Sequence, residues 1–516
     1  MLYPLSEIVT IYFAGLIFLY VSLSLGFLFQ RWIRMGLFEQ LFLGYLVLLC
    51  SYAIIKTSFQ TIALLIPIWL VLYLLLFRDR LCLNVKLIDV KSQILSVTII
   101  WTLIYVLKAF YFWNYSFDLP NLLFADYPNY IKIAEGFQLS GHENALGHRN
   151  VLFAELNFLQ PYRTNDLWLP SLGLDLTNFG SYYIWGLFYT PLVWTLASIS
   201  VYSVLSNIRF KAYRILLSVL ALFAFSGSWY RGLINKVLEV NQGSYDPIGI
   251  IAYPKLAIVF AMLFMVLKNV MTGKINKAAF QLILLVFLVQ STVAVIPVIY
   301  GLLFFLGVRD LWGKRRLKKS YFLLLASISF ITILFGLIYF NSGLTEREVL
   351  QMTSLDILNN ENFSEFLLVF LKKSLYIFLS YFWLSILLSI ILIYSMISKK
   401  AQRYEILALT SVFYFSSTAL YAWYANVGDA YQFSTNLFGP FVVTLIIYLL
   451  LDTNKSLFKK IVGHGVLIIV SIIGFVQITR GSSAFNSPDK IYQYSKQFLM
   501  TVGKTLPELQ SPYGII

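Results

Sequence analysis

The stretch EIVTIYFAGLIFLYVSLSLGFLF, residues 7–29, decides the fold class of this chain. It contains no charged residue after Glu7, and about 20 predominantly apolar residues suffice for an α-helix to cross a bilayer core. Similar runs occupy residues 96–113 and 321–340. None of them alternates apolar and polar residues as a membrane β-strand does. Because a backbone in lipid must satisfy its own hydrogen bonds, each run is predicted to be a transmembrane α-helix.

The composition extends this prediction to the whole chain. Of 516 residues, 59% are hydrophobic and 12% are charged, whereas soluble domains average about 45–50% and about 25%. The first run has no preceding cationic segment and no small-residue cleavage site, so we expect it to be retained as a membrane span. The fold class expected is therefore an all-α integral membrane protein.

The net charge of +15 is concentrated in short segments between the apolar runs. Lys and Arg are enriched in the cytoplasmic loops of membrane proteins, so these segments are predicted to lie inside and to set topology. This accounts for the charge without a nucleic-acid partner. The segments are Arg31/Arg34, Arg78/Arg80/Lys86/Lys91, Arg209/Lys211/Arg214, Lys268/Lys274/Lys277, Arg309/Lys314/Arg315/Arg316/Lys318/Lys319, Lys399/Lys400/Arg403 and Lys455/Lys459/Lys460.

The alternate connections differ in charge, as outer segments should. Residues 114–180 carry seven acidic and three basic residues, and residues 342–365 are also acidic. The scheme closes if residues 280–308 form a hairpin of two short helices, with a turn at Gln290-Ser291-Thr292 and Pro297. It then gives about fourteen helices with both termini outside.

The predicted organisation has three parts. Three leading transmembrane helices occupy residues 1–90, and the main transmembrane bundle occupies residues 91–480. The bundle includes the outer loops 114–180 and 342–365, and an extracytoplasmic tail follows at 481–516. Loops this long in a compact protein are usually functional, which directs attention to the outer surface.

A short helix over residues 128–137 is predicted within the loop 114–180, with Asp126 near its N-cap position. Asp is a preferred residue for capping the start of a helix, which is one explanation of Asp126. The other is a carboxylate held just above the membrane, where it accepts the proton of an acceptor hydroxyl.

The residues Phe124-Ala125-Asp126-Tyr127-Pro128-Asn129-Tyr130-Ile131-Lys132-Ile133-Ala134 resemble the first outer loop of the GT-C glycosyltransferases. The resemblance implies a multi-span bundle whose large first outer loop carries short juxtamembrane helices. It also implies a polyprenyl-phosphate-linked sugar donor, with Asp126 as catalytic base and Tyr127 beside the substrate.

A second stretch, Pro161-Tyr162-Arg163-Thr164-Asn165-Asp166-Leu167-Trp168, is similar to a pattern in GT-C-like bacterial membrane proteins. It implies a catalytic role for Asp166 and substrate contacts from Tyr162 and Arg163. Many family members carry paired acids where this chain has Asp126 followed by Tyr127. This departure leaves open whether Asp118 is the base instead, and whether a divalent cation takes part; no metal-ligand residues are assigned.

A phosphate leaving group requires fixed cations at the outer interface. The substrate-binding candidates are Arg231, Lys255, Arg347 and Lys372, with Lys236 and Lys373 near them in the chain. Lys255 has the alternative of reaching the interface along the helix, and Lys372 has that of meeting lipid head groups.

Other chemistries lack a motif. His142 and His148 are not spaced as ligands on one helix, and neither GxxxxGK[ST] nor HExxH occurs. No cytoplasmic loop is long enough for a nucleotide-binding domain. These observations disfavour a nucleotide-sugar transferase working inside the cell and a pump driven directly by ATP.

We therefore expect a multi-pass enzyme of a bacterial cytoplasmic membrane with an outward-facing active site. It would transfer a hexosyl or pentosyl unit, with inversion, from a polyprenyl-phosphate donor to a glycan, lipid or protein acceptor during cell-envelope glycan biosynthesis. Membrane lipids would be its other partners. The alternatives are an O-antigen-type polymerase or ligase, and a lipid-linked oligosaccharide flippase or other transporter, which should carry charges near mid-span.

Overall fold

The computed structural model is almost entirely helical in the part of the chain that it describes. Two short strands, β1 (Trp113–Asn114) and β2 (Leu119–Pro120), pair antiparallel. The described residues are 5–31, 35–59, 61–64, 67, 90–111, 113–114, 119–120, 127–143, 164–205, 208, 210–225, 254–271, 278, 281–282, 284–285, 295–314, 319–341, 363–380, 389–390, 393, 402–423, 463–469, 471–472 and 475–476.

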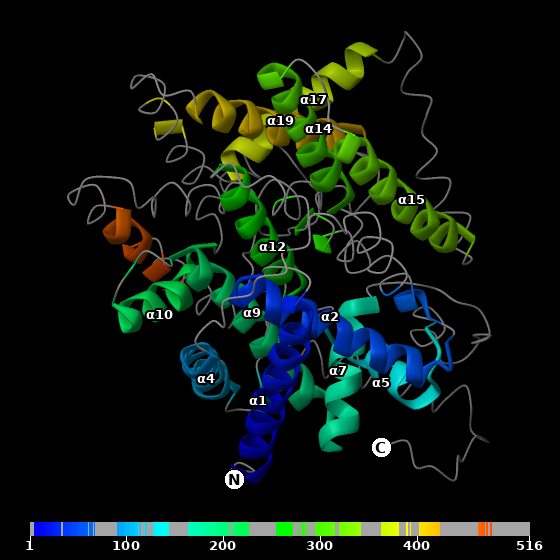
Figure 1. The fold of residues 1–516 in the computed structure, drawn as a ribbon, viewed down its shortest axis with the longest axis vertical. Coiled ribbons are helices and arrows are strands. Elements are labelled where there is room, and N and C mark those ends of the chain that lie inside the picture. The colour runs from blue at the N-terminus through cyan, green and yellow to red at the C-terminus, as the bar shows by residue number, and fades with distance from the viewer. Residues whose placement is uncertain are drawn as a thin grey trace, which may run out of the picture.

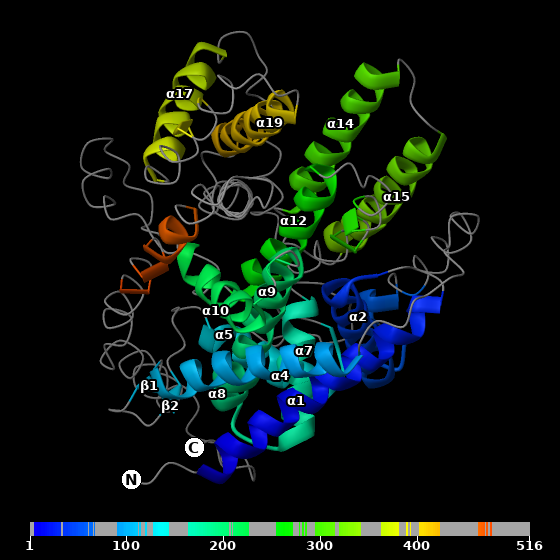
Figure 2. The same cartoon turned by 60° about the vertical axis from the view of Figure 1, so that its left-hand side comes forward.

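Figures 1 and 2 show the helices coloured in chain order, from blue at the N-terminus to red at the C-terminus. The α-helices are α1 (Leu5–Leu28), α2 (Leu37–Lys56), α4 (Val90–Val106), α5 (Tyr127–Ser140), α7 (Thr164–Thr177), α8 (Ser181–Tyr183), α9 (Thr190–Val204), α10 (Lys211–Leu220), α12 (Pro254–Met271), α14 (Val295–Lys314), α15 (Lys319–Asn341), α17 (Phe363–Ser380) and α19 (Gln402–Trp423). The 3₁₀ segments are η1 (Phe29–Arg31), η2 (Ile62–Leu64) and η7 (Ala221–Phe225), and the π-helical segments are η4 (Leu107–Tyr111) and η5 (Ile184–Tyr189).

Four helical stretches of the described chain are long and apolar enough to cross a membrane: Leu5–Leu28, Leu37–Lys56, Gln93–Phe110 and Ser181–Val204. Shorter apolar helices cover Ala257–Asn269, Val295–Arg309 and Tyr321–Leu334. The helices predicted for the three long apolar runs are confirmed by α1, by α4 with η4, and by α15.

The Ser181–Val204 stretch, which comprises α8, η5 and α9, is the centre of the bundle. In an apolar segment of 18 residues within this stretch, 100% of the residues are buried. In the corresponding segment of α1, only 39% are buried. In Figure 2 the helices α1, α2, α4 and α10 lie around α9, and α12 leads from them toward α14. The remaining face of α1 carries exposed large apolar side chains, including Phe13 and Ile17, which suits contact with acyl chains.

The helices α1 and α2 contact each other through their backbones. A Cβ atom added at Gly44 would lie 1.7 Å from the carbonyl oxygen of Ser22, and one at Gly26 would lie 1.9 Å from that of Gln40. Small residues that permit such approach are typical of helix pairs in membranes, where van der Waals packing drives association.

At the other end of the molecule lie α14, α15, α17 and α19 (Figure 2). The hydroxyl of Tyr414 in α19 donates a hydrogen bond to the carbonyl oxygen of Ser374 in α17. The hydroxyl of Tyr300 in α14 donates one of 3.1 Å to the hydroxyl of Ser329 in α15. The predicted turn at Pro297 is wrong, because this proline lies in the first turn of α14. Its missing N–H causes no loss there, since the first amides of a helix have no partner within it.

Candidate functional site

Two helices, α5 and α7, form a packed unit in the chain between η4, which ends at Tyr111, and α8, which begins at Ser181. The rings of Phe137 and Trp168 lie 5.0 Å apart, and the hydroxyl of Ser171 lies 2.7 Å from the carbonyl oxygen of Ala134. The α5 helix confirms the prediction for residues 128–137. The α7 helix was not predicted, and its Pro170 lies inside it.

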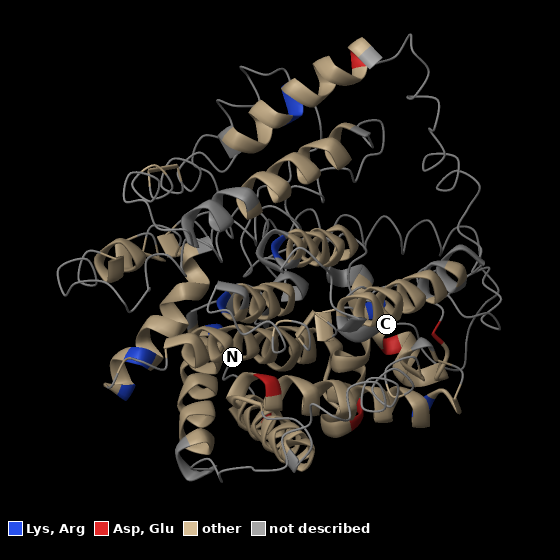
Figure 3. Cartoon of the chain, turned by 45° about the horizontal axis from the view of Figure 1, so that its top comes forward, with Lys and Arg blue, Asp and Glu red and all other residues tan. Residues whose placement is uncertain are grey.

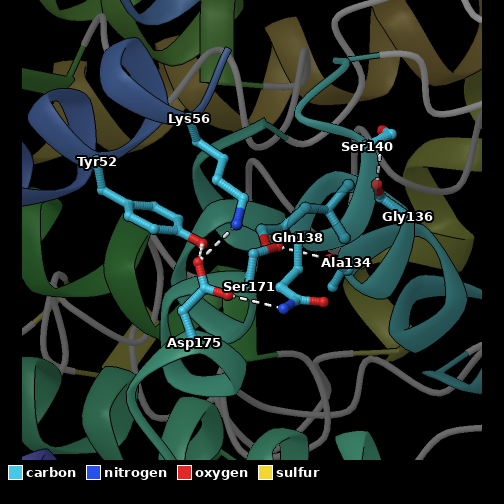
Figure 4. A network of polar contacts seen from close by, with 9 residues as sticks. Tyr52, Lys56, Ala134, Gly136, Gln138, Ser140, Ser171 and Asp175 are labelled. Carbon is cyan, nitrogen blue, oxygen red and sulfur yellow. Dashed lines mark hydrogen bonds and ion pairs between the residues drawn. The ribbon is translucent and has the colours of Figure 1, made fainter. Parts of the chain in front are cut away.

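Asp175 of α7 joins this unit to the end of α2 (Figure 4). Its Oδ2 accepts hydrogen bonds from Tyr52 Oη at 2.7 Å and Lys56 Nζ at 2.8 Å. Its Oδ1 accepts a bond of 2.7 Å from Gln138 Nε2 of α5. One carboxylate therefore connects three helices.

The contacts of Asp175 determine its protonation. Its partial burial acts to raise the pKa, but hydrogen bonds from Lys56, Tyr52 and Gln138 and the charge of Lys56 outweigh burial. The pKa of Asp175 is consequently lowered, so the carboxylate stays ionised in ordinary buffers.

A second carboxylate, Glu143, lies just after α5 and is 2% exposed. Its Oε1 accepts hydrogen bonds from Thr61 Oγ1 and from Trp168 Nε1. Gly141 adopts a positive φ of 67°, and a Cβ there would lie 2.4 Å from the carbonyl oxygen of Lys56. Glycine thus permits the end of α5 to touch the end of α2.

Two π-helical segments, η4 and η5, contact each other, and η5 also contacts α7 of the α5–α7 unit. Lys108 of η4 is 1% exposed, and its ammonium lies 5.8 Å from the centre of the Trp194 ring. Tyr130 of α5 stacks on Trp185 of η5, with ring centres 6.3 Å apart. An ionisable residue within a span is costly and usually functional, and π-helical turns often occur at functional sites. Sequence reasoning missed Lys108 as a site residue, although its charge within an apolar run was visible.

The structure places only some of the predicted site residues. Tyr127 is the first residue of α5, Asp166 the third of α7 and Lys255 the second of α12, but their side chains are not described. The predicted residues outside the described ranges are Asp118, Asp126, His148, Tyr162, Arg163, Arg231, Lys236 and Arg347.

Lys372 lies on α17 with an exposed side chain, in a helix that also exposes Leu368, Leu371 and Leu375. The neighbouring Lys373 is 9% exposed, and its ammonium lies 4.3 Å above the Tyr421 ring. The two lysines therefore have different surroundings, which the sequence could not distinguish.

The described helices carry few charged residues (Figure 3). Among the described residues, no group of three or more His, Cys, Asp or Glu side chains could hold a metal ion. His464 packs against Tyr213 at 5.5 Å between ring centres, in line with a packing role. Comparisons of the chain with models of protein families, with curated proteins and with solved structures found no match.

Proposed function

We propose that this protein is a GT-C-type membrane glycosyltransferase that uses a polyprenyl-phosphate-linked sugar. The proposal is supported chiefly by the α5–α7 unit, which begins directly after Asp126 and is joined to the end of α2. A large loop with short juxtamembrane helices is what the resemblance around Asp126 implies.

The proposed architecture has about fourteen helices, with the acidic loop 114–180 outside. Contacts at both ends of the bundle support alternating helix directions. Lys56 at the end of α2 meets Asp175, while Ser96 near the start of α4 meets Tyr202 near the end of α9 at 2.9 Å. The first pair would be outside and the second inside.

In the proposed reaction, the acceptor hydroxyl attacks the anomeric carbon from the face opposite the phosphate. Asp126 takes the hydroxyl proton, the new glycosidic bond forms, and the bond from the anomeric carbon to the phosphate oxygen breaks with its electron pair going to the phosphate. Basic side chains stabilise the charge on the leaving phosphate. We assign this to Arg231, Lys255, Arg347 and Lys372, and add the membrane-buried Lys108.

The test is transfer of labelled sugar from a polyprenyl-phosphate donor by the full-length protein in vesicles. Asp126→Asn is expected to reduce transfer about 10²–10⁴-fold, the usual contribution of a general base, without reducing donor binding. Glu135→Gln, on the same α5 helix, is the matched control and should retain activity. Full activity in Asp126→Asn would refute the assignment of the base.

A lipid-linked oligosaccharide flippase is the second candidate, favoured by polar groups buried in the bundle. Glu39 Oε1 accepts a hydrogen bond of 2.9 Å from Gln281 Nε2, and Gln281 Oε1 accepts one of 2.8 Å from Asn269 Nδ2. Glu39 lies in the first turn of α2, and Lys108 lies in η4 at the end of its apolar stretch, so these buried charges are near helix ends rather than at mid-span. Donor lipid that crosses the vesicle membrane without any sugar transfer would favour this function over the transferase.

A further inference from the structure

The end of α9 opposite the α5–α7 unit is contacted by two basic side chains from different helices. Arg214 of α10 donates from Nε to the carbonyl oxygen of Tyr202 at 2.7 Å. Lys268 of α12 donates from Nζ to the carbonyl oxygen of the next residue, Ser203, at 3.3 Å. Consecutive carbonyls at a helix C-terminus attract cations, so both side chains are drawn to the same place.

Arg214 makes two contacts with Tyr202. Its guanidinium carbon lies 3.6 Å from the centre of the Tyr202 ring, in addition to the Nε bond. Within the described part of the chain, no hydrogen bond engages the two terminal Nη groups. The side chain is only partly buried.

The surroundings combine positive charge with exposed apolar surface. Lys211, one turn before Arg214, is exposed, and Phe210 and Leu216 are 71% and 49% exposed. Glu39 belongs to this end of the bundle through Gln281 and Asn269, but it is buried, and its Oε2 accepts a bond from the amide of Gly36. Among the described residues at this end of the bundle, the charged side chains of Lys211, Arg214 and Lys268 are exposed or partly buried and are positive.

We propose that Arg214, Lys211 and Lys268 bind the phosphate of an anionic phospholipid at the cytoplasmic surface. The Nη pair of Arg214 matches two phosphate oxygens, a geometry that a lysine cannot reproduce. Lys211 and Lys268 add positive charge, and Phe210 and Leu216 accept the upper part of the acyl chains. This site is distinct from the proposed outer active site, and its cytoplasmic position rests on the proposed topology.

The occupant is a lipid rather than a soluble phosphate because apolar side chains border the cations. Basic residues next to a membrane on its cytoplasmic side gain affinity for anionic lipid from its surface charge. A soluble phosphate would gain nothing from Phe210 or Leu216.

Native mass spectrometry of the full-length protein in detergent tests this proposal. The protein is titrated separately with dioleoyl phosphatidylglycerol, dioleoyl phosphatidylethanolamine and inorganic phosphate. The wild type should prefer phosphatidylglycerol, and Arg214→Gln and Lys211→Gln should each weaken its binding about fivefold. Arg214→Lys keeps the charge but loses the pair of Nη donors, so its affinity should fall between those of wild type and Arg214→Gln.

Lys132→Gln is the matched control, since it removes an exposed lysine from α5. Its phosphatidylglycerol affinity should equal that of wild type. Lys211→Gln keeps the test valid if Arg214→Gln fails to fold, because Lys211 is exposed. Equal binding of the two lipids, an unchanged affinity in the Lys211 variant, or binding of inorganic phosphate without lipid preference would overturn the proposal.

Discussion

Gly44 shows how a single residue sets the distance between two membrane helices. Its Cα faces the carbonyl oxygen of Ser22, and the Cα of Gly26 faces the carbonyl oxygen of Gln40. Neither contact leaves space for a methyl group, and the atoms that a methyl group would meet belong to the backbone. A backbone atom cannot swing aside as a flexible side chain can.

Gly44→Ala should therefore force α1 and α2 apart. We expect the free energy of unfolding to fall by about 1–3 kcal/mol, the usual result of overpacking. Thermal unfolding in detergent measures the change. Gly465→Ala is the control, because a Cβ at Gly465 meets nothing within 4 Å. Equal melting temperatures for the two variants would contradict the close contact.

At the scale of elements, the bonds of Asp175 attach the α5–α7 unit to α2. The pKa of Asp175 is lowered, so folding favours the ionised carboxylate. The resulting stabilisation is complete above the pKa of an unfolded aspartate, about 3.9, and is lost as the pH falls through the lower pKa of the folded state.

Hydrogen exchange measures this attachment. In Asp175→Asn, amides of α5 and α7 should exchange faster at neutral pH, while α9 keeps its protection. In the wild type the same acceleration should appear only below about pH 4. Lys132→Gln on the exposed side of α5 is the control. Acceleration that begins near pH 6 would mean that another group controls the attachment.

At the scale of the whole molecule, the predicted topology puts Lys132 outside and Lys211 inside. A background of Cys50→Ala and Cys82→Ser removes the native thiols. In whole cells whose outer membrane or cell wall has been permeabilised, Lys132→Cys should react with a membrane-impermeant maleimide. Lys211→Cys should react only after the cytoplasmic membrane is disrupted. The reverse pattern would invert the topology and move the α5–α7 unit into the cytoplasm.

The sequence predicted features that depend on neighbours in the chain. The apolar run that begins at Glu7 is helical through Leu28, as expected of a backbone that must satisfy its own hydrogen bonds in lipid, and the helix after Asp126 follows from local signals. The α7 helix was missed because Pro170 interrupts its pattern and tertiary packing compensates. Pro297 was misread because a proline fits a first helical turn as well as a loop.

Contacts between distant residues could not be predicted in this way. Lys56 and Asp175 are 119 positions apart, and nothing in either segment indicates the other. Arg214 and Lys268 were read only as topology signals, because their meeting at the end of α9 depends on how three helices pack. Asp126, the central candidate, stays a prediction.

The glycine contacts between α1 and α2 also bear on how the protein is made. These two helices are adjacent in the chain, and their contact uses backbone and small residues that belong to them alone. The pair can thus associate while the ribosome is still synthesising the rest. Nascent α4 and η5 would then meet a ready-formed surface, in which Gly15 receives the Trp101 indole and Phe18 the Phe188 ring. The N-terminal hairpin would act as a template for the insertion of later helices.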